Sequence, residues 1–95
     1  MGVVKARELA SALKRKGFTE DKKRDHYFYF LHYNGKKSAI YTKISHNESD
    51  IRSQLCSQIA KQMKLTSEQL IEFVDCALDA ERYIKLLIAG KHLQL

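Results

Sequence analysis

The sequence contains no proline and no tryptophan, and only four of its 95 residues are glycine. It has no low-complexity run and no internal repeat, which excludes the repeat architectures. Its hydrophobic fraction of 44% is that of an ordinary globular protein. A chain of this length is expected to form a single domain, residues 1–95, with a small core.

Long apolar runs and cysteine clusters are also missing. No stretch approaches the ~20 apolar residues that a membrane span needs, and the amino terminus has no secretory hydrophobic segment. The two cysteines, Cys56 and Cys76, are isolated and form neither a disulfide framework nor a zinc-binding pattern. We therefore expect a cytoplasmic protein without a membrane partner, and no metal or other cofactor.

The net charge of the whole chain is +6, and its positive charge is concentrated in the first half. Residues 1–24 hold eight Lys and Arg against three acidic residues, and residues 25–46 hold three against one. Residues 47–95 are close to neutral, with six against seven. A basic half of this kind favours a polyanion such as RNA, although a solvated lysine-rich surface is the alternative.

Residues 24–46 hold six of the nine aromatic residues and three of the four histidines. At their centre stands Asn34-Gly35, the dipeptide best suited to a two-residue type I′ turn, because both residues tolerate positive φ. Aromatic and β-branched residues, which pack well in a sheet, flank this dipeptide. The pattern predicts a β-hairpin around which the rest of the chain is arranged.

Side chains alternate between the two faces of this predicted hairpin. A two-residue loop pairs Tyr33 with Lys36, Tyr29 with Ile40, Phe28 with Tyr41 and His26 with Lys43. One face, marked as core by its isoleucines, then carries Tyr27, Tyr29, Leu31, Tyr33, Ile40, Thr42 and Ile44. The solvent face carries His26, Phe28, Phe30, His32, Tyr41 and Lys43. A three-residue loop would reverse which aromatic residues accompany Ile40.

The flanking segments are helical in pattern. An apolar stripe predicts a helix over residues 4–16, after which Phe18 opens a short edge strand near residues 17–20. Residues 20–25 are charged and are expected to form an exposed loop. After the hairpin, Ser45 followed by Glu48 fits a capping box for the next helix, with Asn47 and Ser49 as alternative caps.

A further capping box, Thr66 with Gln69, begins the last helical segment, which ends at Gly90. Its apolar stripe is interrupted near residues 79–81, so two short helices are the alternative to a single long one. The expected fold class is therefore α+β, an α-β-β-β-α sandwich with one or two additional C-terminal helices. It resembles the double-stranded-RNA-binding domain with an extension.

Five short motifs follow one another along the chain, and their order matters for the comparison below. They are Leu13-Lys14-Arg15-Lys16-Gly17-Phe18, His26-Tyr27-Phe28-Tyr29, Gly35-Lys36-Lys37, Ile44-Ser45-His46 and Asp50-Ile51-Arg52-Ser53-Gln54-Leu55. Over about residues 4–70 they resemble the HicA toxins, small mRNA interferases of toxin–antitoxin systems. The resemblance implies RNA cleavage and a small antitoxin partner, with residues 4–65 as the HicA-like core and 66–90 as a helical extension.

The same resemblance implies that His26 is the catalytic residue. In the family this histidine follows Gly-Ser, whereas Arg24-Asp25 precedes it here. His46 matches a second landmark, in which a proline usually stands two residues earlier; here Ile44 occupies that position. His46 is therefore a secondary candidate, and fixing the strand-to-helix turn is its more conservative role.

The chemistry of RNA cleavage also favours His26. Without a metal, cleavage needs a group that moves a proton near neutral pH, and only histidine has an unperturbed pKa there. The 2′-hydroxyl is the nucleophile, and a nearby cation such as Lys43 can stabilise the charge that develops on the phosphate. The alternative is a surface histidine without a chemical role.

The remaining candidates would bind RNA. The cations are Lys22, Lys23, Arg24, Lys36, Lys37 and Lys43. Phe28 and Tyr41 would stack on bases, or would belong to the core in the other register. His26 and His32 lack the spacing of metal ligands. Two hypotheses remain, a HicA-like ribonuclease and a non-catalytic RNA-binding module; a weaker third is a protein-interaction domain that uses the C-terminal helix.

Overall fold

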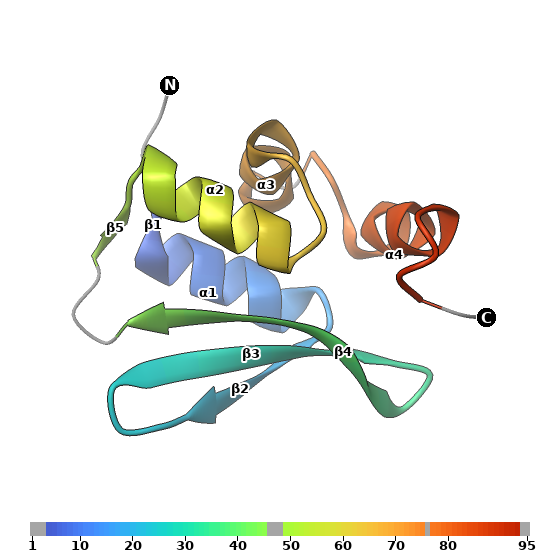
Figure 1. Cartoon of the computed structure of the whole chain (residues 1–95), viewed down its shortest axis with the longest axis horizontal. Helices are drawn as coiled ribbons and strands as arrows, with labels where there is room; N and C mark the ends of the chain where they lie inside the picture. The colour runs from blue at the N-terminus through green and yellow to red at the C-terminus, as the bar shows by residue number, and fades with distance from the viewer. Residues whose placement is uncertain (1–3, 46–48, 76, 94–95) are drawn as a thin grey trace.

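The computed structural model describes residues 4–45, 49–75 and 77–93. The elements in chain order are β1 (Val4–Lys5), α1 (Ala6–Arg15), β2 (Phe18–Lys22), β3 (His26–Tyr33), β4 (Lys36–Ser45), β5 (Asp50–Ile51), α2 (Ser53–Gln62), α3 (Ser67–Val74) and α4 (Ala80–Ala89). A three-stranded sheet is covered by α1 and α2, with α3 and α4 beside them (Figure 1). This α+β arrangement confirms the predicted fold class, including both additional C-terminal helices.

The main sheet is antiparallel with the strand order β2-β3-β4. The turn of the predicted hairpin is confirmed, since Asn34 and Gly35 both have positive φ, 54° and 75°. Tyr33 pairs with Lys36 as expected. Residues 20–22 belong to β2, so the exposed connection is shorter than the predicted loop.

Farther from the turn, three predicted strand pairs are wrong. Between Phe30 and His32 the register shifts, because three residues of β4 stand opposite one residue of β3. The Ser38 hydroxyl accepts a hydrogen bond from the backbone N–H of Ile40 at 3.1 Å, a local contact that competes with the strand ladder. His26 therefore pairs with Ser45 rather than Lys43, and the predicted pairs Tyr29–Ile40 and Phe28–Tyr41 become Tyr29–Thr42 and Phe28–Lys43.

The predicted faces survive this shift. An offset of two residues keeps every side chain on its own side of the sheet, whereas an offset of one would reverse them all. The buried side chains of β3 and β4 are Tyr29, Leu31, Ile40, Thr42 and Ile44. The only polar one, Thr42, donates its hydroxyl to the side-chain oxygen of Gln62 at 2.5 Å. The face marked by isoleucines is therefore the core face, as predicted.

The extension beyond residue 65 packs into the same core. Phe73 and Tyr83 are fully buried, and their rings lie 6.3 and 6.0 Å from the ring of Phe18. The ammonium group of the buried Lys16, just after α1, donates to the backbone carbonyls of Phe73 and Leu78. Phe73 and Leu78 are both buried, and the aromatic neighbours of Phe73 come from β2 and α4.

The predicted helix starts are right for the extension and wrong for α2. Thr66 and Gln69 form the expected capping box, and the Asp79 carboxylate accepts from the backbone N–H of Arg82 at 2.8 Å, which begins α4 separately. The predicted Ser45–Glu48 capping box is wrong, because Ser45 ends β4 and α2 begins only at Ser53. Glu48 and Asn47 lie outside the described residues.

A short antiparallel pair, β1 with β5, lies where a continuous helix was predicted from residue 4. The Lys5 ammonium contacts the Asp50 carboxylate at 2.9 Å across this pair, which lowers the pKa of Asp50.

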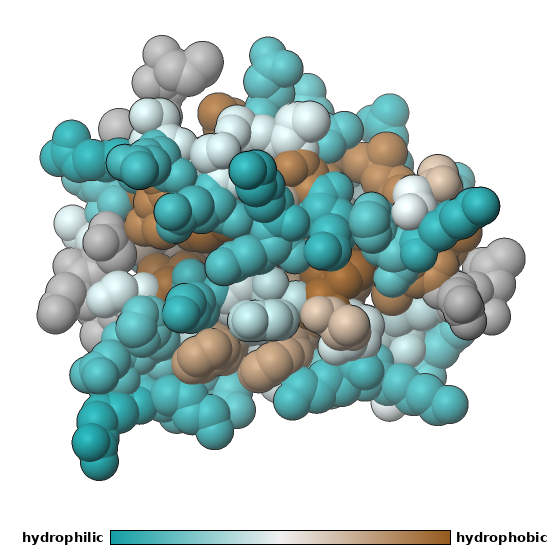
Figure 2. All heavy atoms as spheres, viewed as in Figure 1, coloured by the Kyte–Doolittle hydropathy of each residue, from teal (hydrophilic) through white to brown (hydrophobic). Residues whose placement is uncertain are grey.

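Hydrophobic residues are visible mainly between the packed elements, and hydrophilic residues dominate the outline (Figure 2). None of the helices in the described part of the chain has the length and apolar character that a membrane crossing requires.

Candidate RNA-binding and cleavage site

An aromatic face lies on the side of the sheet opposite α1 and α2. It consists of Phe28 and Phe30 on β3 and Tyr41 on β4. The rings of Phe28 and Phe30 are nearly parallel, with centroids 6.2 Å apart, and the centroid of the Tyr41 ring lies 5.7 Å from that of Phe30. Tyr41 is 42% exposed, an unusual value for a large ring packed against two others. This arrangement presents flat π surfaces to solvent, which is what base stacking requires.

Two lysines accompany the aromatic face. The ammonium nitrogen of Lys37 lies 3.8 Å from the centroid of the Phe30 ring, a cation–π contact. Lys43 is exposed and pairs with Phe28, so both side chains stand on the same side of the sheet. Lys36 is exposed at the hairpin turn. These positions bring Lys37 and Lys43 to the rings.

His26 continues the aromatic face at the start of β3. Its ring centroid lies 6.2 Å from that of Phe28, and the residue is half-buried. His26 and Lys43 also line one small cavity of 120 Å³ at the β4 edge of the sheet, where α2 provides the rest of its lining together with Ser45. Although the two residues are not a strand pair, the structure brings them to one cavity.

Two glutamines of α2, Gln58 and Gln62, also line this cavity, together with Ser45, Leu55 and Ile59. Sequence reasoning did not single out either glutamine. The Gln62 side-chain oxygen accepts from Thr42, and its NH₂ group adds a donor beside the cavity. Their spacing of one helical turn places both side chains on one face of α2. The spacing can be read from the sequence. The cavity cannot, because it depends on how α2 crosses β4.

The basic residues at the end of β2 and just after it do not all belong to the aromatic face. Lys22 pairs with Tyr27 and therefore shares the side of α1; its ammonium nitrogen lies 5.8 Å from the Tyr27 ring centroid. Lys23 lies 3.4 Å from the Asp21 carboxylate, and Arg24 is exposed in the loop. The structure therefore does not gather the whole predicted RNA-binding set on the aromatic face.

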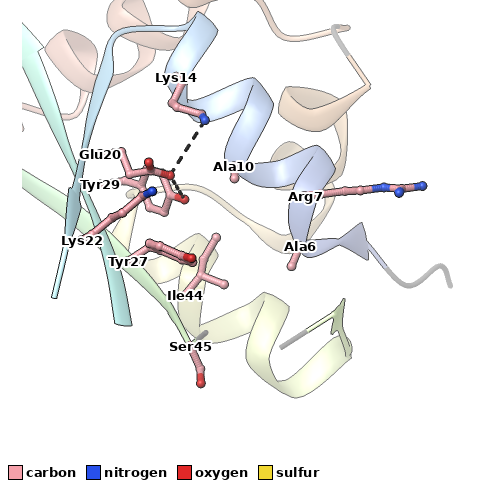
Figure 3. Close-up of a pocket in the computed structure, with 10 residues that line it drawn as sticks. All are labelled: Ala6, Arg7, Ala10, Lys14, Glu20, Lys22, Tyr27, Tyr29, Ile44 and Ser45. Carbon is pink, nitrogen blue, oxygen red and sulfur yellow. Dashed lines mark hydrogen bonds and ion pairs between the residues drawn. The ribbon is translucent and has the colours of Figure 1, made fainter. Parts of the chain in front are cut away.

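A larger cavity of 340 Å³ lies on the side of α1, and sequence reasoning did not anticipate it (Figure 3). There the Tyr29 hydroxyl donates to the Glu20 carboxylate at 2.8 Å. Burial, and next this hydrogen bond, raise the pKa of Tyr29. A tyrosine in this environment remains protonated and acts as a structural donor.

Two further residues, His46 and Cys56, and a possible metal site remain to be considered. The secondary candidate His46 lies outside the described residues. Cys56 is buried, and that burial raises the pKa of its thiol, as expected for a core residue. Within residues 4–45, 49–75 and 77–93, no three His, Cys, Asp or Glu side chains come close enough to hold a metal ion.

The comparison with protein families identifies the chain. The family model described as "HicA toxin of bacterial toxin-antitoxin" matches residues 6–65, more than half of the sequence. The chain belongs to the HicA toxin family. Neither a curated protein nor a solved structure matches it. The family match ends at Leu65, so the core contacts of α3 and α4 are made by residues beyond the HicA region.

Proposed function

We propose that this HicA family member is an mRNA interferase toxin that binds RNA on the aromatic face and cleaves it at His26 without a metal ion. The observation that carries the proposal is the position of His26 at the end of the stacked rings, in one cavity with Lys43. Bases would stack on Phe28, Phe30 and Tyr41. A phosphate beside the last stacked base would then lie within reach of both His26 and Lys43.

The reaction needs one proton acceptor and one stabilising charge. Neutral His26 takes the proton of the ribose 2′-hydroxyl, and the 2′-oxygen attacks the adjacent phosphorus. The bond from phosphorus to the 5′-oxygen breaks, and that oxygen takes a proton from water. The products are a 2′,3′-cyclic phosphate and a free 5′-hydroxyl. The Lys43 ammonium stabilises the negative charge that gathers on the phosphate oxygens in the transition state.

A non-catalytic RNA-binding module is the second candidate. It is favoured by Arg24 and Asp25, which stand where the family has Gly-Ser. In this case the aromatic face would retain RNA without cleaving it.

The proposal includes a partner and a location. Membership of a toxin–antitoxin family supports a small antitoxin protein as the partner. An antitoxin that covers the His26 side of the sheet would exclude RNA from the rings and from the cavity. The protein would act in the cytoplasm, where mRNA is available.

A histidine pair on one strand allows a controlled test. His26 and His32 lie on the same strand and the same face, but His32 is at the far end of the rings. We would induce wild type, His26→Ala and His32→Ala in a bacterial host and follow growth and total mRNA. Removing the general base should slow cleavage about 10²- to 10⁴-fold, so His26→Ala should be harmless. His32→Ala should remain toxic.

Purified proteins separate cleavage from binding. Wild type should cleave a single-stranded RNA in the presence of EDTA, and His26→Ala should bind that RNA with little loss of affinity, because phosphate and stacking contacts elsewhere dominate binding. A His26→Ala protein that cleaves as fast as wild type would remove the histidine from the mechanism. RNA binding without cleavage by wild type would establish the second candidate.

A further inference from the structure

The cavity on the α1 side of the sheet exists because α1 presents alanines to it. Ala6 and Ala10 stand opposite Tyr27 and Ile44, and their short side chains do not fill the space between helix and sheet (Figure 3). Its volume of 340 Å³ is within the range of pockets that hold small ligands. The alanines and Ile44 therefore give the cavity apolar walls, and Tyr27 and Tyr29 add two aromatic rings.

The rim of this cavity is cationic. Lys14 and Lys22 reach it from α1 and β2, and Glu20 is its one carboxylate. That carboxylate is already engaged, because it accepts from Tyr29 and lies 3.9 Å from the Lys14 ammonium nitrogen. The Arg7 side chain also borders the cavity, but its guanidinium points away from it (Figure 3). Lys22, beside the Tyr27 ring, is the cation best placed to meet an anionic group.

The two cavities adjoin at the end of the sheet. Ser45 lines both the α1-side cavity and the smaller cavity that contains His26 and Lys43. Tyr27 follows His26 in β3, so the two rings lie on opposite faces at the same end of the strand. An RNA strand that leaves His26 around this end of the sheet would reach Tyr27 and Lys22 next.

We propose that the α1-side cavity is a second nucleotide subsite, which holds a nucleotide adjacent to the phosphate at His26. The base would lie against Tyr27 and the two alanines of α1, with a phosphate oxygen at Lys22. This inference rests on the proposed RNA-binding function. A nucleotide fits better than an acidic peptide because the cavity combines aromatic rings, apolar walls and a cation, and shares Ser45 with the cavity at His26.

Filling the cavity tests the subsite directly. Ala10→Leu adds a large side chain into the space, and Ser11→Leu adds the same side chain to the next, exposed residue of α1, which does not line the cavity. Both would be made in full-length His26→Ala protein, so that a fluorescein-labelled single-stranded RNA octamer of mixed sequence stays intact. Ala10→Leu should weaken binding at least about fivefold, the loss expected when one stacked base is displaced. Ser11→Leu should bind as the parent does.

A second measurement avoids any effect of Ala10→Leu on folding. In ¹⁵N-labelled His26→Ala protein, the octamer should shift the backbone amide signals of Ala10 and Tyr27, and Lys22→Gln should reduce those shifts. Equal octamer affinity of Ala10→Leu and Ser11→Leu, with no shift at Ala10, would overturn the subsite. The RNA-binding function would still stand if Phe30→Ala weakened binding in the same assay. If the parent protein bound no octamer at all, both proposals would fail.

Discussion

Removal of the Phe73 ring should destabilise the whole domain. Phe73 belongs to α3, beyond the HicA match, yet it is fully buried. Its ring lies 6.3 Å from Phe18, 5.2 Å from Tyr83 and 4.6 Å from the Lys16 ammonium nitrogen. Phe73→Ala leaves a cavity among these groups, which costs about 3–5 kcal/mol for a buried phenylalanine. Domains of this size have total stabilities of about 5–15 kcal/mol.

Thermal unfolding followed by circular dichroism would measure this loss. A domain of 60–100 residues loses about 4–8 °C in Tm per kcal/mol, so Phe73→Ala should melt at least about 12 °C below wild type. Phe28→Ala is the matched control, because it removes the same ring from the half-buried aromatic face; it should cost about 1 kcal/mol or less. If Phe73→Ala melted with wild type, α3 would be an appendage and the packing argument would be refuted.

Two further predictions concern charge and thiol chemistry. If about four phosphates are contacted, the logarithm of RNA affinity should fall with the logarithm of salt concentration at a slope near −3. A variant with alanine at Lys22, Lys23 and Arg24 should have a shallower slope. An unchanged slope would show that these three residues do not contact phosphates. Burial raises the pKa of Cys56 above its ordinary value, so its thiol stays neutral near pH 8. In a Cys76→Ser background, Cys56 should react with a thiol reagent only slowly until the protein is unfolded; fast labelling of the folded protein would contradict its burial.

The hairpin shows which structural features can be predicted from local sequence. Asn34-Gly35 fixes the turn because few other dipeptides accept two positive φ angles, and alternation then fixes the two faces. The strand pairs beyond Phe30 depend on a register shift in β4 that no residue type demands. Ser38 stabilises it with one hydrogen bond, but serine does this in many loops and strands.

The candidate site could be predicted only in part, because local patterns fix the faces of a strand but not how the elements pack together. The open face could be derived from the period of two, and it contains the predicted histidine, rings and two of the lysines. Lys22 was assigned to an exposed loop, but it extends β2 and turns toward α1 because it pairs with Tyr27. The α1-side cavity arises from how closely α1 approaches the sheet above Tyr27, a distance that side-chain periodicity does not encode.

Residues within the HicA match depend on contacts with the C-terminal extension. Phe18 lies within the family match, but the two rings packed against it, Phe73 edge-on and Tyr83 stacked, lie outside it. Lys16 is likewise within the match, and the carbonyls that accept its buried ammonium belong to residues 73 and 78. Without the extension, an apolar ring and a charge would lose the partners that satisfy them at the end of α1 and the start of β2. Because β2 holds β3 in place and β3 carries His26, the extension supports the candidate site from the opposite side of the sheet.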